Sequence, residues 1–250
     1  ALPIYRVSEQ EQETNATEAS QTDGETSEEE ESDDMEMRFP QVSPKSTVSQ
    51  MIGINKVAVT YSRPSVDDPE TGEKRKIWGE LVPYGERWRT GANARTRITF
   101  SHDVKIQGQK LEAGTYSMFS IPGKDQWTLI FNNQLKGSAL SGYDKSKDAL
   151  RVKAQPKEGP YHEMMTFQFR DVTDNSGILE LAWKKTRVPF NIDTETDKQL
   201  MAMMEEKVQK AGDDDWEVYN QCAAYLAEEQ MHMDKAKEWV AQSREIKKHW

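Results

Sequence analysis

The sequence has only one cysteine, Cys222, and no run of eighteen apolar residues. A single cysteine cannot form a disulfide within the chain, so cysteine usage does not indicate the redox compartment. The lack of a long apolar run leads us to expect no membrane-spanning helix. With 250 residues and a mean hydropathy of −0.89, the chain is long enough for one medium-sized domain with appendages.

Motifs that carry common chemistry are also missing. The sequence has no strand–Gly-x-Ser-x-Gly–helix elbow, no glycine-rich phosphate loop and no dinucleotide-binding fingerprint. The histidines are far apart and lack the paired spacing of a metal site: His102, His162, His232 and His249. We therefore expect no metal and no cofactor, and we favour a protein without catalytic activity. Cys222 falls within an expected amphipathic helix, where a packing role is more typical than a reactive one.

Clustered positive charge is absent as well. The net charge is −10, and Lys and Arg occur only in short stretches of mixed charge. Because binding to a phosphate backbone requires a basic surface, we expect no nucleic-acid partner.

The first 41 residues contain an acidic stretch. From Glu9 to Glu36 there is no Lys or Arg, and few residues are apolar, which predicts a disordered linker. The alternative is a docking tail for a basic partner or for divalent cations. Ahead of it lies a short apolar segment that includes Leu2, Ile4 and Tyr5. It is either a docking segment for a protein partner, with peripheral association to the cell envelope as one form of this, or a remnant of processing. The chain opens with Ala1 rather than Met, as after removal of a signal peptide, so we expect an exported protein; a shortened chain would look the same.

Residues 42–192 form the expected main domain. Short runs in which apolar and polar residues alternate are separated by Gly, Pro, Asn and Asp, which predicts about eight or nine half-buried strands. With no long helices between them, an antiparallel β-sandwich or barrel-like domain is favoured. The expected core positions are Val57, Val59, Tyr61, Ile98, Phe100, Val104, Ile106, Phe119, Ile121, Trp127, Leu129, Phe131, Leu150, Val152, Met165, Phe167, Phe169, Leu179, Leu181 and Trp183.

Residues 193–250 form the expected helical tail. Amphipathic periods predict helices at about 196–210, 215–229 and 233–248. The spacing of six residues loosely resembles one helix-turn-helix unit of the tetratricopeptide type: Trp216, Tyr219, Ala223, Ala227, Ala236 and Trp239. One such unit is not stable alone, so we expect this tail to contact the β domain, a protein partner or further repeats.

The most unusual segment runs from Lys76 to Asn93 and follows neither a strand nor a helix pattern. Its aromatic rings and guanidinium groups suit a concave binding surface, but they equally suit the closure of a sheet edge or barrel end. The candidate ligand- or partner-binding residues are Trp78, Tyr84, Arg87, Trp88, Arg89 and Asn93.

Several ordered motifs support a family resemblance. They are Ser43-Pro44-Lys45-Ser46, Val59-Thr60-Tyr61-Ser62-Arg63-Pro64, Lys76-Ile77-Trp78-Gly79, Trp88-Arg89-Thr90-Gly91-Ala92-Asn93, and Ala113-Gly114-Thr115-Tyr116-Ser117 followed by Ile121-Pro122. Together they resemble the bacterial family catalogued as domain of unknown function 2911. The resemblance implies a secreted or periplasmic location, and it brings no reaction, cofactor or catalytic residue.

Two departures from the family pattern are visible. Ala94 stands where we expect an acidic residue, followed by Arg95 and Arg97 where small or hydroxyl residues are usual. The segment from Gln134 to Tyr143 lacks an expected Trp-Gly pair. The first departure argues against a site that depends on an acid at position 94.

Two functions remain open at this point. The first is a non-catalytic, extracytoplasmic binding or accessory subunit of a larger assembly, with partner contacts through the N-terminal segment and the helical tail. The second is a carbohydrate- or peptide-binding protein, or a hydrolase, with its site in the segment from Trp78 to Asn93.

Overall fold

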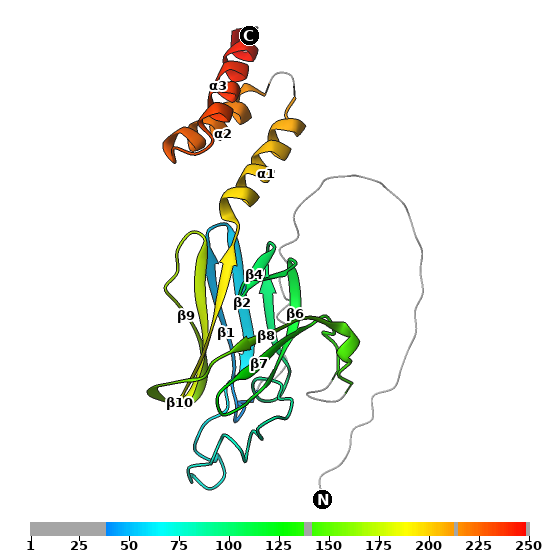
Figure 1. Ribbon diagram of the computed structural model, residues 1–250, viewed down its shortest axis with the longest axis vertical. Helices are drawn as coiled ribbons and strands as arrows, with labels where there is room; N and C mark the ends of the chain where they lie inside the picture. The colour runs from blue at the N-terminus through cyan, green and yellow to red at the C-terminus, as the bar shows by residue number, and fades with distance from the viewer. Residues whose placement is uncertain (1–38, 138–141, 213–214, 249–250) are drawn as a thin grey trace, which may run out of the picture. The chain divides into compact units, whose positions relative to one another are not determined.

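The computed structural model describes residues 39–137, 142–212 and 215–248 (Figure 1). The chain divides into the units Ala1–Phe39 and Pro40–Trp250, and every helix and strand of the described part belongs to the second unit. Leu2, Ile4 and Tyr5 and the acidic stretch from Glu9 to Glu36 lie outside the described residues. The docking and linker roles expected for them stay predictions.

The described strands form two antiparallel sheets, as the alternating pattern predicts. The larger sheet has the order β1-β2-β3-β6-β7-β8, and its strands are β1 (Lys45–Ile52), β2 (Asn55–Ser62), β3 (Thr96–Phe100), β6 (Gly114–Ile121), β7 (Trp127–Asn132) and β8 (Asp148–Ala154). The smaller sheet has the order β5-β4-β10-β9, with β5 (Gln109–Leu111), β4 (Val104–Ile106), β10 (Ser176–Thr194) and β9 (Lys157–Arg170). A short 3₁₀ turn, Lys145–Lys147, precedes β8.

The core lies between the two sheets, and most of the predicted apolar positions belong to it. Phe119 is buried outside this cluster, Phe169 packs against it while partly buried, and Ile121, at the end of β6, is only partly buried and does not belong to it. Residues from both sheets, such as Val59, Phe131, Leu181 and Phe190, belong to one buried cluster. The described residues contain ten strands, so the prediction of eight or nine was too low. The additional strands are β1 and β5, whose sequences carry few apolar residues in alternation.

Three helices follow the sheets, as predicted: α1 (Thr196–Lys210), α2 (Trp216–Glu228) and α3 (Met233–Lys248). Their buried side chains form a second cluster, separate from the core of the sheets: Met204, Cys222, Ala223, Leu226, Ala236 and Trp239. Cys222 is buried there, and desolvation raises the pKa of its thiol, which confirms a packing role. No helix in the described part of the chain is both long and apolar enough to cross a membrane.

The turn between β1 and β2 meets the start of α1. Gly53 begins this two-residue turn with a φ of +56°, a conformation that glycine adopts without strain. A Cβ atom on Gly53 would lie 2.2 Å from Thr196 Oγ1 and 2.3 Å from the carbonyl oxygen of Asp174. The Thr196 hydroxyl donates a 2.6 Å hydrogen bond to that same carbonyl. Gly53 therefore allows the turn, the β9–β10 connection and the first residue of α1 to meet.

Replacing Gly53 with alanine is expected to destabilise the protein strongly, by about 3 kcal/mol or more, because backbone strain adds to a steric clash. The matched control is Gly108→Ala, since Gly108 has a φ of +78° but nothing within 4 Å of the added Cβ. The control should cost only about 1 kcal/mol. Chemical denaturation measures both values, and equal losses would contradict the role assigned to Gly53.

Candidate functional site

In strand β10 the core-facing positions change from odd-numbered to even-numbered residues at Lys184. Before Lys184 the buried positions are Leu179, Leu181 and Trp183, and after it they are Val188, Phe190 and Ile192. The pairing with β9 shifts register on both sides of Lys184, whose φ is +53°. Such a bulge changes the alternation of the strand, so that beyond it the even-numbered side chains point to the core and the odd-numbered ones point outward.

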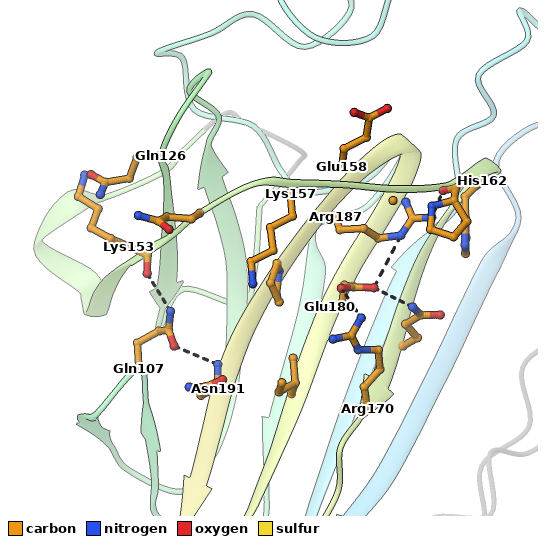
Figure 2. Close-up of a pocket in the computed structure, with 16 residues that line it drawn as sticks. Gln107, Gln126, Lys153, Lys157, Glu158, His162, Arg170, Glu180, Arg187 and Asn191 are labelled. Carbon is orange, nitrogen blue, oxygen red and sulfur yellow. Dashed lines mark hydrogen bonds and ion pairs between the residues drawn. The ribbon is translucent and has the colours of Figure 1, made fainter.

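Because of this change, Glu180 and Arg187 both lie on the outer face of the β9–β10 pair, away from the core. Both line a pocket of about 660 Å³ over that face, which we call the outer pocket (Figure 2). Its lining also includes Lys153, Lys157 and His162.

The Glu180 carboxylate lies at the base of the outer pocket and is only 2% exposed. Gln168, directly opposite it on β9, donates to Oε1 at 2.8 Å, and Arg170 donates to Oε2 at 3.2 Å. The Nε atom of Arg187 lies 3.7 Å from Oε1. A buried carboxylate is tolerated when it is paired and hydrogen-bonded in this way.

Arg187 is itself almost fully buried, at 5% exposure. Its guanidinium donates to the carbonyl of Thr186 at 3.0 Å and to the carbonyl of Pro160. Gly159 makes room for it, because a Cβ atom there would lie 2.8 Å from Arg187 Cγ. The start of β9 therefore crosses closely over Arg187 and closes one side of the outer pocket (Figure 2).

Positive charge exceeds negative charge among the described residues that line the outer pocket. The cations are Lys153, Lys157, Arg170 and Arg187, against the carboxylates of Glu158 and Glu180. Lys153 donates to Thr128 Oγ1 at 2.8 Å. Within the described part of the chain, the Lys157 ammonium has no hydrogen-bond or ion-pair partner.

His162 lies on β9 beside this charge cluster (Figure 2). Partial burial disfavours its protonated form and is the largest cause that lowers its pKa, and the positive charge of Arg187 acts in the same direction. These effects favour the neutral form of its imidazole. The ring has no hydrogen-bond partner among the described residues. Sequence analysis gave this histidine no role.

The candidate residues predicted from sequence lie elsewhere. Trp78 and Trp88 join Trp127 and Trp183 in a tryptophan cluster, where Trp88 stacks on Trp183 at 5.9 Å. Trp88, Trp127 and Trp183 belong to the core of the sheets, and Trp78 packs against it. The indole of Trp78 donates to Thr186 Oγ1 at 2.7 Å, and that of Trp88 donates to the carbonyl of Gly91 at 3.0 Å. The structure thus brings these two candidates together, and the indole N–H group of each already donates a hydrogen bond within the protein.

The other candidates are dispersed around the same segment. Arg87 lies over the ring of Tyr143 at 3.8 Å, and Tyr84 is 40% exposed. Asn93 donates to the carbonyl of Ser43 at 3.0 Å. Arg87, Trp88 and Arg89 line a common pocket. None of the six candidates lines the outer pocket.

The two places where the sequence departs from the family pattern, at Arg95 and in the segment from Gln134 to Tyr143, contact each other in the structure. Arg95 is 5% exposed, and its guanidinium donates to the carbonyls of Gln134 at 2.9 Å and Lys136 at 3.0 Å. Arg95 therefore supports the segment in which the expected Trp-Gly pair is missing. Residues 138–141 of that segment lie outside the described part.

No group of three or more His, Cys, Asp or Glu side chains that could hold a metal ion occurs in the described ranges. Residues 43–192 match the family model described as "Protein of unknown function (DUF2911)". This match covers more than half of the chain, so the chain belongs to that family. Comparison with curated proteins found no match, and neither did comparison with solved structures.

Glu180→Gln is expected to destabilise the protein by about 3 kcal/mol, because it leaves the buried Arg187 guanidinium without a counterion. The matched control is Glu80→Gln, which removes an exposed pair with Lys76 (side chains 59% and 68% exposed) and should cost less than about 1 kcal/mol. Denaturant titration of both variants tests this. A stability of Glu180→Gln close to that of the parent would show that the pair is not needed.

The lowered pKa of His162 predicts a pH-dependent stability. Between roughly pH 6.5, where an unfolded histidine titrates, and the lower pKa in the folded state, the unfolded chain binds more protons. Stability should therefore fall as the pH drops through this window. His162→Gln should reduce that decline, whereas the control His102→Gln should not. Melting temperatures from pH 5 to 7.5 measure the effect, and parallel curves for the parent and His162→Gln would contradict it.

Proposed function

We propose that this member of the family is an exported, non-catalytic binding protein whose β domain holds a small anionic ligand in the outer pocket. The observation that carries the proposal is the excess of positive charge around a concave, partly buried site in a chain of net charge −10. Such a local reversal of charge favours an anionic ligand.

The contacts of Glu180 support binding rather than acid–base catalysis. Its two carboxylate oxygens accept from Gln168 and Arg170, and Arg187 lies close by. These contacts occupy the oxygens that would accept a proton from a substrate. Glu180 instead fixes the positions of two guanidinium groups, one of which, Arg170, remains 47% exposed at its side chain. Arg170 is therefore available to a ligand.

Lys153 and Lys157 supply the other positive charges that would bind the anionic ligand. Lys157 has no partner in the described part of the chain, and Lys153 makes a single hydrogen bond to a hydroxyl group. Ammonium and guanidinium groups together match the oxygens of a carboxylate or phosphate. Among the described residues that line the outer pocket, none is Phe, Tyr or Trp. An aromatic platform for a sugar ring is thus not offered there, which favours a small anion over a carbohydrate in this pocket.

An accessory role for the helices belongs to the same proposal. A hollow of about 310 Å³ on α2 and α3 is lined by Ala227, Met233, Ala236 and Val240, among others. Met233 is 43% exposed, and flexible methionine side chains suit protein contacts. This supports the likeness to a tetratricopeptide unit and contact with a partner protein. Cell fractionation tests the exported location, and recovery in the cytoplasm would argue against it.

Lys157→Ala should weaken the binding of citrate or inorganic phosphate about tenfold, because one charge-assisted contact is lost. Lys56→Ala, which removes an exposed lysine of β2, is the matched control and should leave binding unchanged. Isothermal titration calorimetry at low ionic strength measures both, with glycerol as a neutral reference. If neither anion binds the parent protein, or if Lys157→Ala binds both as tightly as the parent does, the proposal fails.

A further inference from the structure

A separate pocket of about 420 Å³ lies against β1, β2 and β3 of the larger sheet and shares no described lining residue with the outer pocket. We call it the sheet pocket. Thr60 and Arg97 line it, whereas their neighbours Val59 and Ile98 belong to the core. Because successive side chains of a strand point to opposite faces, the sheet pocket lies on the face turned away from the core.

The register of the sheet brings two cations to this face. Lys45 on β1 pairs with Ser62 on β2. Arg97 on β3 pairs with Thr60, two residues away from Ser62 on the same strand. All four side chains therefore belong to one face. Lys45 and Arg97 lie on either side of β2, about 10 Å apart across the strands. Both are exposed, so a ligand can reach their ammonium and guanidinium groups.

The described residues that line the sheet pocket carry positive charge and no negative charge. The charged side chains among them are Lys45, Arg95 and Arg97. Lys45 and Arg97 have no hydrogen-bond or ion-pair partner in the described part of the chain. In the whole sequence acidic residues outnumber Lys and Arg by 43 to 33, so this pocket is a local reversal of charge. Repulsion between its like charges is relieved when an anion binds.

Arg95 gives the sheet pocket a fixed wall. It is nearly buried and donates to the carbonyls of Gln134 and Lys136. Gly137 lets the chain pass close to it, because a Cβ atom there would lie 2.6 Å from Arg95 Nη2. A ligand does not need to contact this buried guanidinium. Direct contact falls to the exposed side chains of Lys45 and Arg97.

We propose that the sheet pocket binds a phosphate monoester, whose phosphoryl oxygens accept from the Arg97 guanidinium and the Lys45 ammonium. A phosphate monoester carries about −1.5 to −2 charges at pH 7, which matches these two cations better than the single charge of a carboxylate. A planar guanidinium binds two phosphate oxygens at once, and an ammonium adds a point charge. The volume of 420 Å³ falls in the range of pockets for small organic ligands, so the organic part of the ester also fits.

The same chemical group occurs on small phosphorylated molecules and on the phosphatidate headgroup of a lipid surface. Glycerol 3-phosphate represents the first source, with glycerol and glycerate as its neutral and carboxylate counterparts. Phosphatidylcholine vesicles that contain phosphatidate represent the second, with pure phosphatidylcholine vesicles as their control. Binding of glycerol 3-phosphate, with glycerate at least tenfold weaker, supports the free ester. Binding of the phosphatidate vesicles alone supports the headgroup.

Arg97→Gln should weaken binding of the phosphate monoester at least tenfold and Lys45→Gln about fivefold, because each removes a charge-assisted contact. Both positions are exposed, so both variants should fold, and circular dichroism checks this. Arg97→Lys keeps the charge and should restore part of the binding. The matched control is Lys56→Gln, which changes an exposed lysine of β2 outside the pocket and should bind as the parent does.

Titrations of the full chain at low ionic strength, followed by amide chemical shifts, give both the affinity and the location. Glycerol 3-phosphate should shift the amides of Thr60 and Ser62 until they saturate, whereas citrate in the outer pocket should shift those of Gln168 and Glu180. Vesicle binding is measured by sedimentation. The two pockets are thus tested independently, and this inference does not rest on the proposed function.

Three results would overturn the inference. The first is that glycerol 3-phosphate leaves the amides of Thr60 and Ser62 unshifted and phosphatidate vesicles do not bind. The second is that glycerate binds at these amides as tightly as glycerol 3-phosphate does. The third is that folded Arg97→Gln binds the ester or the phosphatidate vesicles as the parent does.

Discussion

The bulge at Lys184 determines which side chains meet on the two faces of β10. In an uninterrupted strand, Glu180 and Arg187 would point to opposite faces, since their numbers differ in parity. The register shifts on both sides of Lys184 bring them to the same outer face. The outer pocket therefore depends on one irregular residue in the longest strand of the described chain.

The outer pocket is built around a buried pair of opposite charges, Glu180 and Arg187. Glu180 and Arg187 are each almost withdrawn from water, and their attraction must offset the cost of desolvating both. Gln168, Arg170 and the carbonyl of Pro160 supply the additional hydrogen bonds that make such a pair tolerable. This network ties the start of β9 to the middle of β10. The fold thus holds a rigid base beneath the two lysines at the pocket.

Local periodicity was sufficient to predict most of the fold. Alternation around Val57, Phe131 and Leu181 gave the strands, and the longer period after Thr194 gave the helices. Strand β1 was missed because its outward positions are polar and its inward positions are only partly apolar. The irregular segment from Lys76 to Asn93 was correctly predicted to lack regular strands and helices, and its only β-pairing among the described residues is by isolated bridges.

The outer pocket could not be predicted from the sequence. Glu180 stands between apolar residues and is typical of a solvent-facing strand position, and Arg187 follows a lysine-rich stretch. Only the bulge brings them together. The apolar positions change from odd to even numbers between Trp183 and Val188, but the sequence does not show at which residue the bulge lies or which outward side chains it brings together. The contact between Arg95 and the segment near Gln134 could not be predicted from the sequence either, because it joins residues 39 positions apart in the chain.

The separate buried clusters of the sheets and the helices have a consequence for how the protein opens. The cluster of Met204, Leu226 and Trp239 contains few fully buried residues, whereas that of the sheets contains many. Opening free energy rises with buried apolar contact, so units with small cores exchange their amide hydrogens first and expose protease sites first. The helical tail is therefore expected to open before the β domain does. A partner that binds these helices would change their protection from exchange and leave that of the sheets almost unaltered.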